Sequence, residues 1–176
     1  MNLNPGEFEW SQPEAFRRLY QLTNPLTGDG QAVGTLRFEK LGGSLATAQY
    51  GEDCWTLKRT GFLSPRILIR QAGSEQDFAV YTPNWTGGGW LVFGSGRYQL
   101  RSKNFWATEW QFQAEDGSPM VQITGPHGLF KQGGHVKVTE SAASLPETPL
   151  MLLLIWYLRI LMNEDASAGA VVAACT

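Results

Sequence analysis

The stretch that decides the fold is TPLMLLLIWYLRILM, residues 148–162, which is followed by Asn163, Glu164 and Asp165. Twelve of the thirteen residues from 150 to 162 are apolar, and Arg159 is the exception. Thr148 and Pro149 suit the N-cap and the first position of a helix, so we expect a helix over 148–163. Its apolar side chains point in every direction, and such a helix is stable only when apolar material surrounds it.

The length of this helix favours the protein core over a membrane. A membrane span needs about 20 apolar residues, and this run is shorter. At 1.5 Å per residue it is about 20 Å long, close to the length of an average strand in a small barrel. A buried guanidinium is costly without a partner, so we expect Arg159 to pair with a carboxylate or to lie at the mouth of the enclosing structure.

Upstream of the helix, from about residue 35 to residue 140, apolar residues recur at every second position. Examples are Leu36 and Phe38, Trp55 and Leu57, Ile67 and Ile69, Val121 and Ile123, and Val136 and Val138. Turns rich in Gly and Pro separate these runs, as at 87–89 and 133–134. Short alternating strands joined by such turns are typical of an antiparallel sandwich or barrel. About ten strands are recognisable, and segments 44–50 and 128–132 are candidates for one or two more.

The strands and the helix together predict one architecture. Eight strands leave room only for their own side chains, whereas a larger barrel can enclose a helix. We therefore predict a mainly β protein in which residues 1–163 form one domain. This domain is a closed antiparallel barrel of about twelve strands, threaded by the hydrophobic helix at 148–163.

Both ends of the chain carry further expectations. Ser11 and Glu14 have the spacing of a capping box, and Phe16, Leu19 and Tyr20 then fall on one side of a helix. This pattern predicts a short N-terminal helix over 11–21. Residues 164–176 are mostly small and follow the polar residues that we expect to end the closing helix, so we expect a flexible tail there.

The order of elements resembles the tubby C-terminal-like family, which includes the plant LURP-one-related proteins and the phospholipid scramblases. The resemblance extends over about residues 20–162. It is carried by the strand pair 55–59 and 66–70, the strand with Trp106 and Trp110, and the closing apolar helix. It implies a twelve-stranded barrel around a C-terminal hydrophobic helix. It also implies lipid binding, because tubby proteins bind phosphoinositides through Lys and Arg on the barrel wall. Their ligand positions do not align with this chain, which also lacks the palmitoylation and calcium-binding segments of scramblases.

The balance of charges bears on possible partners. The chain has 14 Lys and Arg against 16 Asp and Glu, a net charge of −2. Proteins that bind nucleic acid are normally strongly basic, so we expect no nucleic-acid partner. The candidate binding residues are instead six cations expected on the outer barrel wall: Lys58, Arg66, Arg70, Arg97, Arg101 and Lys103. Such cations suit an anionic phospholipid or a membrane surface, although charged outer faces are also usual in soluble barrels.

The strand pattern explains why these cations are expected outside. Lys58 alternates with the apolar Trp55 and Leu57 along its strand, so the two kinds of side chain project from opposite faces. By the same alternation Arg97, Arg101 and Lys103 share one face of their strand, and Arg66 and Arg70 share one face of theirs.

No constellation for catalysis or metal binding is recognisable. His127 and His135 lie eight positions apart without further ligands at zinc spacing. Segment 94–96 is neither a nucleophile elbow nor a dinucleotide loop, since the required strand and helix context is missing. Cys54 and Cys175 form no disulfide framework. We therefore expect no cofactor and no enzymatic activity.

The expected location is cytoplasmic, with peripheral attachment to a membrane left open. The two cysteines suit a reducing compartment, and the first ten residues lack the pattern of a signal peptide. The preferred function is a non-enzymatic binding module that engages anionic lipid or another amphiphile at the barrel wall. The alternatives are a structural or protein-interaction domain without a small ligand, and a scramblase-like membrane protein. The sequence identifies no protein partner.

Overall fold

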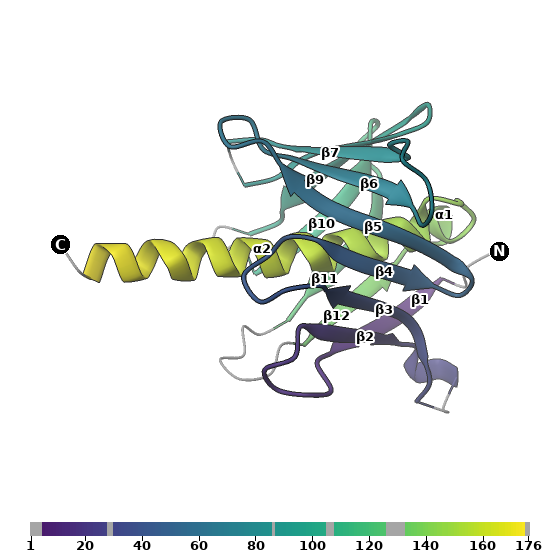
Figure 1. Cartoon of the computed structure of the whole chain (residues 1–176). Coiled ribbons are helices and arrows are strands. Elements are labelled where there is room, and N and C mark those ends of the chain that lie inside the picture. Colours follow the sequence, from purple (N-terminus) through teal and green to yellow (C-terminus); the bar gives the residue numbers. More distant parts are fainter. Residues whose placement is uncertain (1–4, 28–29, 86, 105–107, 126–132, 175–176) are drawn as a thin grey trace.

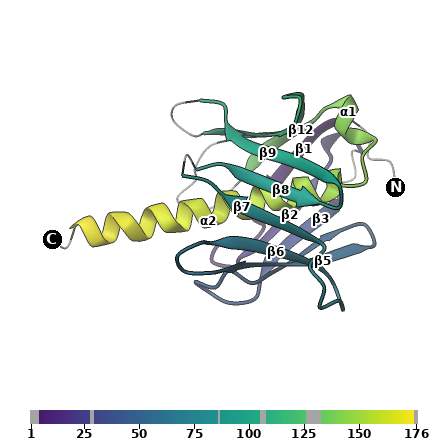
Figure 2. The same ribbon diagram turned by 90° about the horizontal axis from the view of Figure 1, so that it is seen from above.

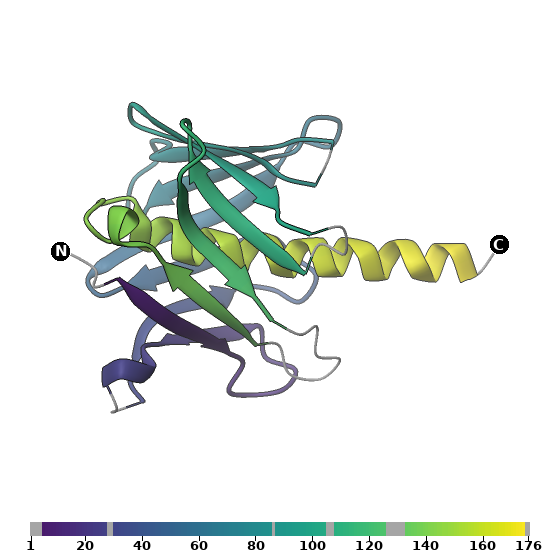
Figure 3. The same cartoon turned by 180° about the vertical axis from the view of Figure 1, so that it is seen from behind.

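The protein is a closed barrel of twelve antiparallel strands, which confirms the predicted fold class. The computed structural model describes residues 5–27, 30–85, 87–104, 108–125 and 133–174. The strands are β1 (Gly6–Ser11), β2 (Leu19–Thr23), β3 (Ala32–Phe38), β4 (Ala46–Tyr50), β5 (Asp53–Thr60), β6 (Arg66–Gln71), β7 (Ala79–Pro83), β8 (Gly89–Phe93), β9 (Gly96–Ser102), β10 (Glu109–Ala114), β11 (Pro119–Thr124) and β12 (Gly134–Val138). Each strand pairs with its neighbours in sequence, and β1 pairs with β12 to close the barrel (Figures 1 and 3).

The alternation of apolar and polar residues decides which face of each strand points inward. In β6, Ile67 and Ile69 are buried, while Arg66 and Arg70 lie on the outer face. Successive side chains of a strand point to opposite faces, so this pattern fixes the register of the wall. The expected extra strand in 44–50 is present as β4, whereas 128–132 and Trp106 lie outside the described residues.

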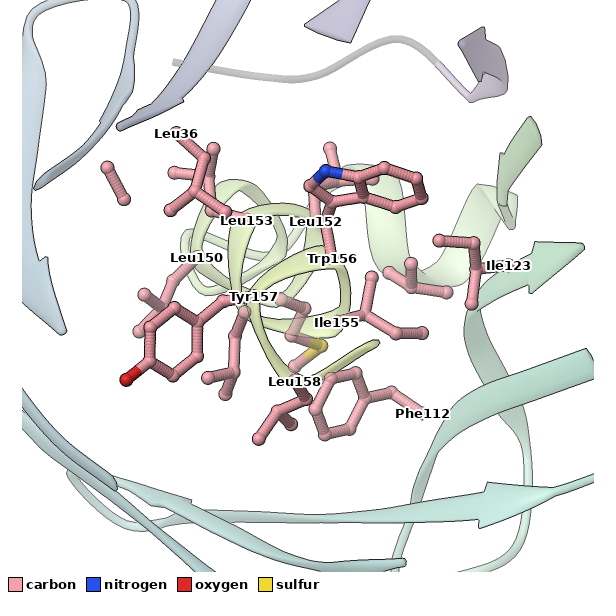
Figure 4. Packing of buried hydrophobic residues seen from close by; sticks show 14 of the residues in the cluster. Leu36, Phe112, Ile123, Leu150, Leu152, Leu153, Ile155, Trp156, Tyr157 and Leu158 are labelled. Carbon is pink, nitrogen blue, oxygen red and sulfur yellow. The ribbon is translucent and has the colours of Figure 1, made fainter. Parts of the chain in front are cut away.

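Helix α2 (Thr148–Ala174) runs through the lumen and fills it (Figures 1 and 2). Every residue from 148 to 161 is buried. Figure 4 shows side chains of α2 pointing outward from the helix on several sides to meet strand residues such as Leu36, Phe112 and Ile123. A short helix, α1 (Glu140–Ala143), connects β12 to α2 at the end where α2 begins.

Aromatic stacking fixes the rotation of α2 inside the barrel. The Trp156 indole stacks on that of Trp10 with ring centroids 5.5 Å apart, and the Tyr157 ring stacks on Phe38 at 5.4 Å. Gly134 on β12 lies under Trp156, where an added methyl group would come within 3.0 Å of the indole. A larger residue at this position would displace the indole, because packed cores leave few voids.

Polar contacts hold α2 where it leaves the barrel. Arg159 is buried, and its guanidinium donates to the backbone oxygen of Gly125, directly after β11, at 2.6 Å, so it lies inside the barrel near its mouth. Desolvation lowers the pKa of Arg159. Arg18 is largely buried and pairs with Glu164 at 2.7 Å, and Arg59 pairs with Asp165 at 2.6 Å. These contacts join the helix to loops and strands far away in the sequence.

The predicted N-terminal helix over 11–21 is wrong. Ser11 ends β1, where it pairs with Gln21 of β2, and the only short helical element in the described N-terminal residues is the 3-10 turn η1 (Pro25–Thr27). Tyr20 and Leu22 are buried with the period of a strand, while Phe16 is exposed in the connecting loop. Closing the barrel requires these two strands, and their pairing outweighs the local capping pattern.

The predicted end of the closing helix at residue 163 is also wrong, because α2 continues to Ala174 and projects beyond the barrel (Figure 1). Residues 164–174, expected to belong to a tail, are therefore part of the helix. Asn163, Glu164 and Asp165 do not end the helix. The carboxylates of Glu164 and Asp165 are paired with arginines of the barrel rim, and the alanines that follow favour helix. Arg159 therefore lies near the middle of α2 and not in its last turn.

We expect the barrel to fold only with its helix. Replacing Leu153, which is fully buried, with Ala should lower the free energy of unfolding by about 2–5 kcal/mol through lost burial and a cavity. Leu153→Asp should prevent folding, because a carboxylate at this fully buried position would lie among apolar side chains. Urea denaturation followed by circular dichroism measures the first change, and the circular dichroism spectrum without urea shows whether the second variant folds. Leu41→Asp, at an exposed loop position, is the matched control. A folded barrel after deletion of residues 148–176 would contradict this account.

Candidate anion-binding face

Positive charge is concentrated in one stretch of the sequence, residues 54–108. Residues 54–108 contain seven Lys and Arg but only two acidic residues, Glu75 and Asp77, which gives a formal charge of +5. The remaining residues carry seven Lys and Arg against fourteen Asp and Glu, a formal charge of −7. Neighbours in sequence are also neighbours in the barrel, so β5–β9 form one continuous side. Two acidic residues border this stretch: Asp53, the first residue of β5, and Glu109, the first residue of β10. We call the outer surface of residues 54–108 the basic sector.

All six candidate cations lie in the basic sector, in two groups. Lys58 is on β5, and Arg66 and Arg70 are on β6. Arg97 and Arg101 are on β9, and Lys103 directly follows that strand. Strands β7 and β8 separate the groups. The structure therefore places the six residues on one side of the barrel but does not bring them into one pocket.

An apolar strip connects the two groups of cations. The pairing register runs from Lys58 through Leu68, Val80 and Val92 to Arg97, one residue on each of five neighbouring strands. At about 4.8 Å per strand, the row is about 19 Å long. Outer positions of a barrel in water are usually polar. The apolar residue Val92 is an exception, because it is 47% exposed. An amphiphile has an apolar part and a polar or charged headgroup. Apolar side chains with a cation at each end can contact both parts.

The cations differ in how far their charge is already neutralised. Arg70 pairs with Asp77 at 2.7 Å, so it contributes little to attraction of an anion. Among the described residues, the other five candidates have no carboxylate at ion-pair distance. The Arg97 guanidinium lies 4.1 Å from the ring centre of Trp90, and Lys103 donates to the side-chain oxygen of Gln122 at 3.1 Å. Both contacts orient a cation without neutralising it.

The described residues that could take part in catalysis or metal binding are not brought together in one site. His135 is exposed on β12, and His127 lies outside the described residues. Asp116 accepts hydrogen bonds from Ser118 in the β10–β11 turn, and these bonds lower its pKa. Across the described part of the chain, no three His, Cys, Asp or Glu residues are grouped so that they could hold a metal ion.

In the comparisons with known proteins, no family model, curated protein or solved structure matches the chain. In the described residues, no helix has both the length and the hydropathy that crossing a membrane requires.

The alternation of residues along the strands predicted the outward cations, but three features of the face were missed. The uneven charge could have been found by counting charges strand by strand. The sequence contains a weaker signal for the apolar strip, namely the three consecutive apolar residues Ile67, Leu68 and Ile69 in β6. The stacking of Arg97 on Trp90 required the structure, because it joins side chains of two strands.

We expect removal of metal ions to leave the protein unchanged. Unfolding and refolding in excess EDTA should give a Tm within about 1 °C of the untreated protein, because the described residues contain no ligand group for a metal to stabilise. Differential scanning calorimetry measures the Tm. A drop of several degrees that zinc or calcium reverses would contradict this expectation.

Proposed function

We propose that this protein is a non-enzymatic binding module that attaches to anionic phospholipid, or to another anionic amphiphile, through the basic sector. The observation that carries the proposal is the division of charge, with +5 on residues 54–108 in a chain of net charge −2. A protein with this asymmetry can turn its basic side toward an anionic surface and its acidic side away. Cytoplasmic location at the periphery of a membrane is part of this proposal.

The energetics favour a membrane surface over a single small anion. Each cation near an anionic membrane adds about 1 kcal/mol, and the attraction falls off within a Debye length of about 10 Å. The five candidate cations that have no ion-pair partner in the described part of the chain lie on β5, on β6 and on or just after β9, so they can meet several headgroups at once. The apolar strip of Leu68, Val80 and Val92 lies between them, where a ligand's apolar groups would be accommodated.

The filled lumen supports binding on the outside of the barrel. Helix α2 occupies the interior, which other barrels use for small apolar ligands. The resemblance to the tubby C-terminal-like family is in line with binding at the wall, because tubby proteins use wall cations for phosphoinositides. Scramblase-like activity would require the apolar part of α2 to enter lipid, and residues 148–161 are buried within the barrel.

Neutralising three cations of the basic sector tests the proposal. The triple variant Arg97→Gln, Arg101→Gln and Lys103→Gln should lose sedimentation with phosphatidylserine-containing vesicles, because about 3 kcal/mol of attraction is removed. The free energy of unfolding should stay within about 0.5 kcal/mol, as is usual for surface changes. Wild-type binding should weaken as salt rises.

The control variant Arg37→Gln, Lys40→Gln and Lys137→Gln changes the net charge equally but outside the basic sector. It should bind nearly as the wild type does. An equal loss of vesicle binding in both variants would show that binding depends only on the net charge of the protein. A wild-type protein that ignores anionic vesicles at low salt would contradict the proposal and favour a protein-interaction domain.

A further inference from the structure

Three large apolar side chains project into solvent at one corner of the basic sector. Phe62 and Leu63 lie in the β5–β6 loop, and Trp85 lies in the β7–β8 loop; their exposed fractions are 98%, 91% and 106%. We call these three residues the apolar tips. Both loops lie at the end of the barrel from which α2 emerges, where Arg59 beside the β5–β6 loop pairs with Asp165 of the helix (Figures 1 and 2).

A groove of about 400 Å³ lies between the two loops and joins two of the apolar tips, Leu63 and Trp85, to a cation. Leu63 and Pro65 line it on one side, and Pro83 and Trp85 on the other. Arg66, one of the cations without an ion-pair partner, also lines the groove. Side chains this large and this exposed, grouped around one groove, mark an interaction surface.

We propose that the apolar tips insert into the interfacial region of an anionic phospholipid bilayer, while Arg66 and the rest of the basic sector contact the headgroups. This inference rests on the proposed function and gives the bound protein an orientation. Trp is enriched at the boundary between headgroups and acyl chains, and an Arg beside it can keep its charge among the headgroups. The tips stand on two separate hairpin turns, a shape suited to entering a soft, disordered layer.

The charges near the tips favour an anionic bilayer as the occupant. Between Cys54 and Thr108 the acidic residues are Glu75 and Asp77, both in the β6–β7 loop at the other end of the strands. The acidic residues of α2 nearest to this end, Glu164 and Asp165, are paired with Arg18 and Arg59. Two other strongly exposed apolar residues at this end, Phe16 and Leu41, lie around a second pocket. Three of the four cations that line it are already paired with carboxylates: Arg17 with Glu14, Arg18 with Glu164 and Arg37 with Glu39.

The experiment compares a tip variant with a matched control. The tip variant is Phe62→Ser, Leu63→Ser and Trp85→Ser, and the control is Leu41→Ser with Leu26→Ser, two other highly exposed leucines. Binding to vesicles with about 30% phosphatidylserine is measured at about 0.1 M and about 1 M salt, where the screening length falls from about 10 Å to about 3 Å. We expect the tip variant to lose at least tenfold in partition coefficient, and to lose all binding at high salt. The control should match the wild type, and circular dichroism should show all variants folded.

A second measurement reports insertion directly. Brominated acyl chains quench only an indole that reaches them. Among the described tryptophans, Trp85 is fully exposed and Trp90 is partly exposed on the barrel wall, where Arg97 covers its ring. The other four, Trp10, Trp55, Trp110 and Trp156, are buried. Wild-type fluorescence should therefore be quenched on brominated vesicles, and Trp85→Phe should lose most of this quenching.

The possible failures are distinguishable. Wild-type-like binding by the tip variant, without quenching by brominated lipid, would overturn insertion and leave the proposed function standing. Absence of wild-type binding to anionic vesicles would overturn both. A dimer in solution that the tip variant dissociates, without lipid quenching, would assign the tips to a second copy of the chain and also overturn the inference.

Discussion

The mutual dependence of helix α2 and the barrel is the constraint on which the rest of the structure depends. A helix that is apolar on all sides needs apolar contacts on all sides, and a twelve-stranded barrel is too wide to fill with its own side chains. The stacking of Trp156 on Trp10 and of Tyr157 on Phe38 shows how closely the two parts fit. Every strand must therefore present apolar residues inward at every second position. This requirement fixes the inner face of the wall and leaves the outer face free to vary.

The free outer face carries the features that point to function. Because α2 fills the lumen, a ligand meets the outside of the barrel, where +5 on residues 54–108 is opposed by −7 on the rest of the chain. The apolar strip from Leu68 to Val92 and the apolar tips lie in the same sector as the cations. The pairs Arg18–Glu164 and Arg59–Asp165 hold the helix and also neutralise carboxylates at the end where the tips project. These two ion pairs thus stabilise the barrel mouth and also favour attraction of this end to an anionic surface.

The sequence predicted what local periodicity determines and failed where distant segments decide. The all-apolar run of α2 and the alternating strands gave the barrel, its antiparallel pairing and the helix inside it. The capping pattern at Ser11 was misleading, because the pairing of β1 with β12 across the whole chain makes this segment a strand. The helix did not end after Met162, because Arg18 and Arg59, more than 100 residues away, pair with Glu164 and Asp165. The alternation of residues along the strands predicted the six cations on the outer wall. The neutralisation of Arg70 by Asp77 and the position of the apolar tips depend on how the loops fold, which the alternation does not determine.

The most direct test of the central claim, that helix and barrel form one inseparable core, is native-state hydrogen exchange across the chain. Amides of residues 151–160 should exchange only through global unfolding, with the same free energy as amides in strands such as β3 and β11. Equal protection of helix and strands is the result that this account predicts. Exchange of the helix amides by a separate opening of lower free energy, with the strands still protected, would show that α2 can leave the lumen and would contradict it.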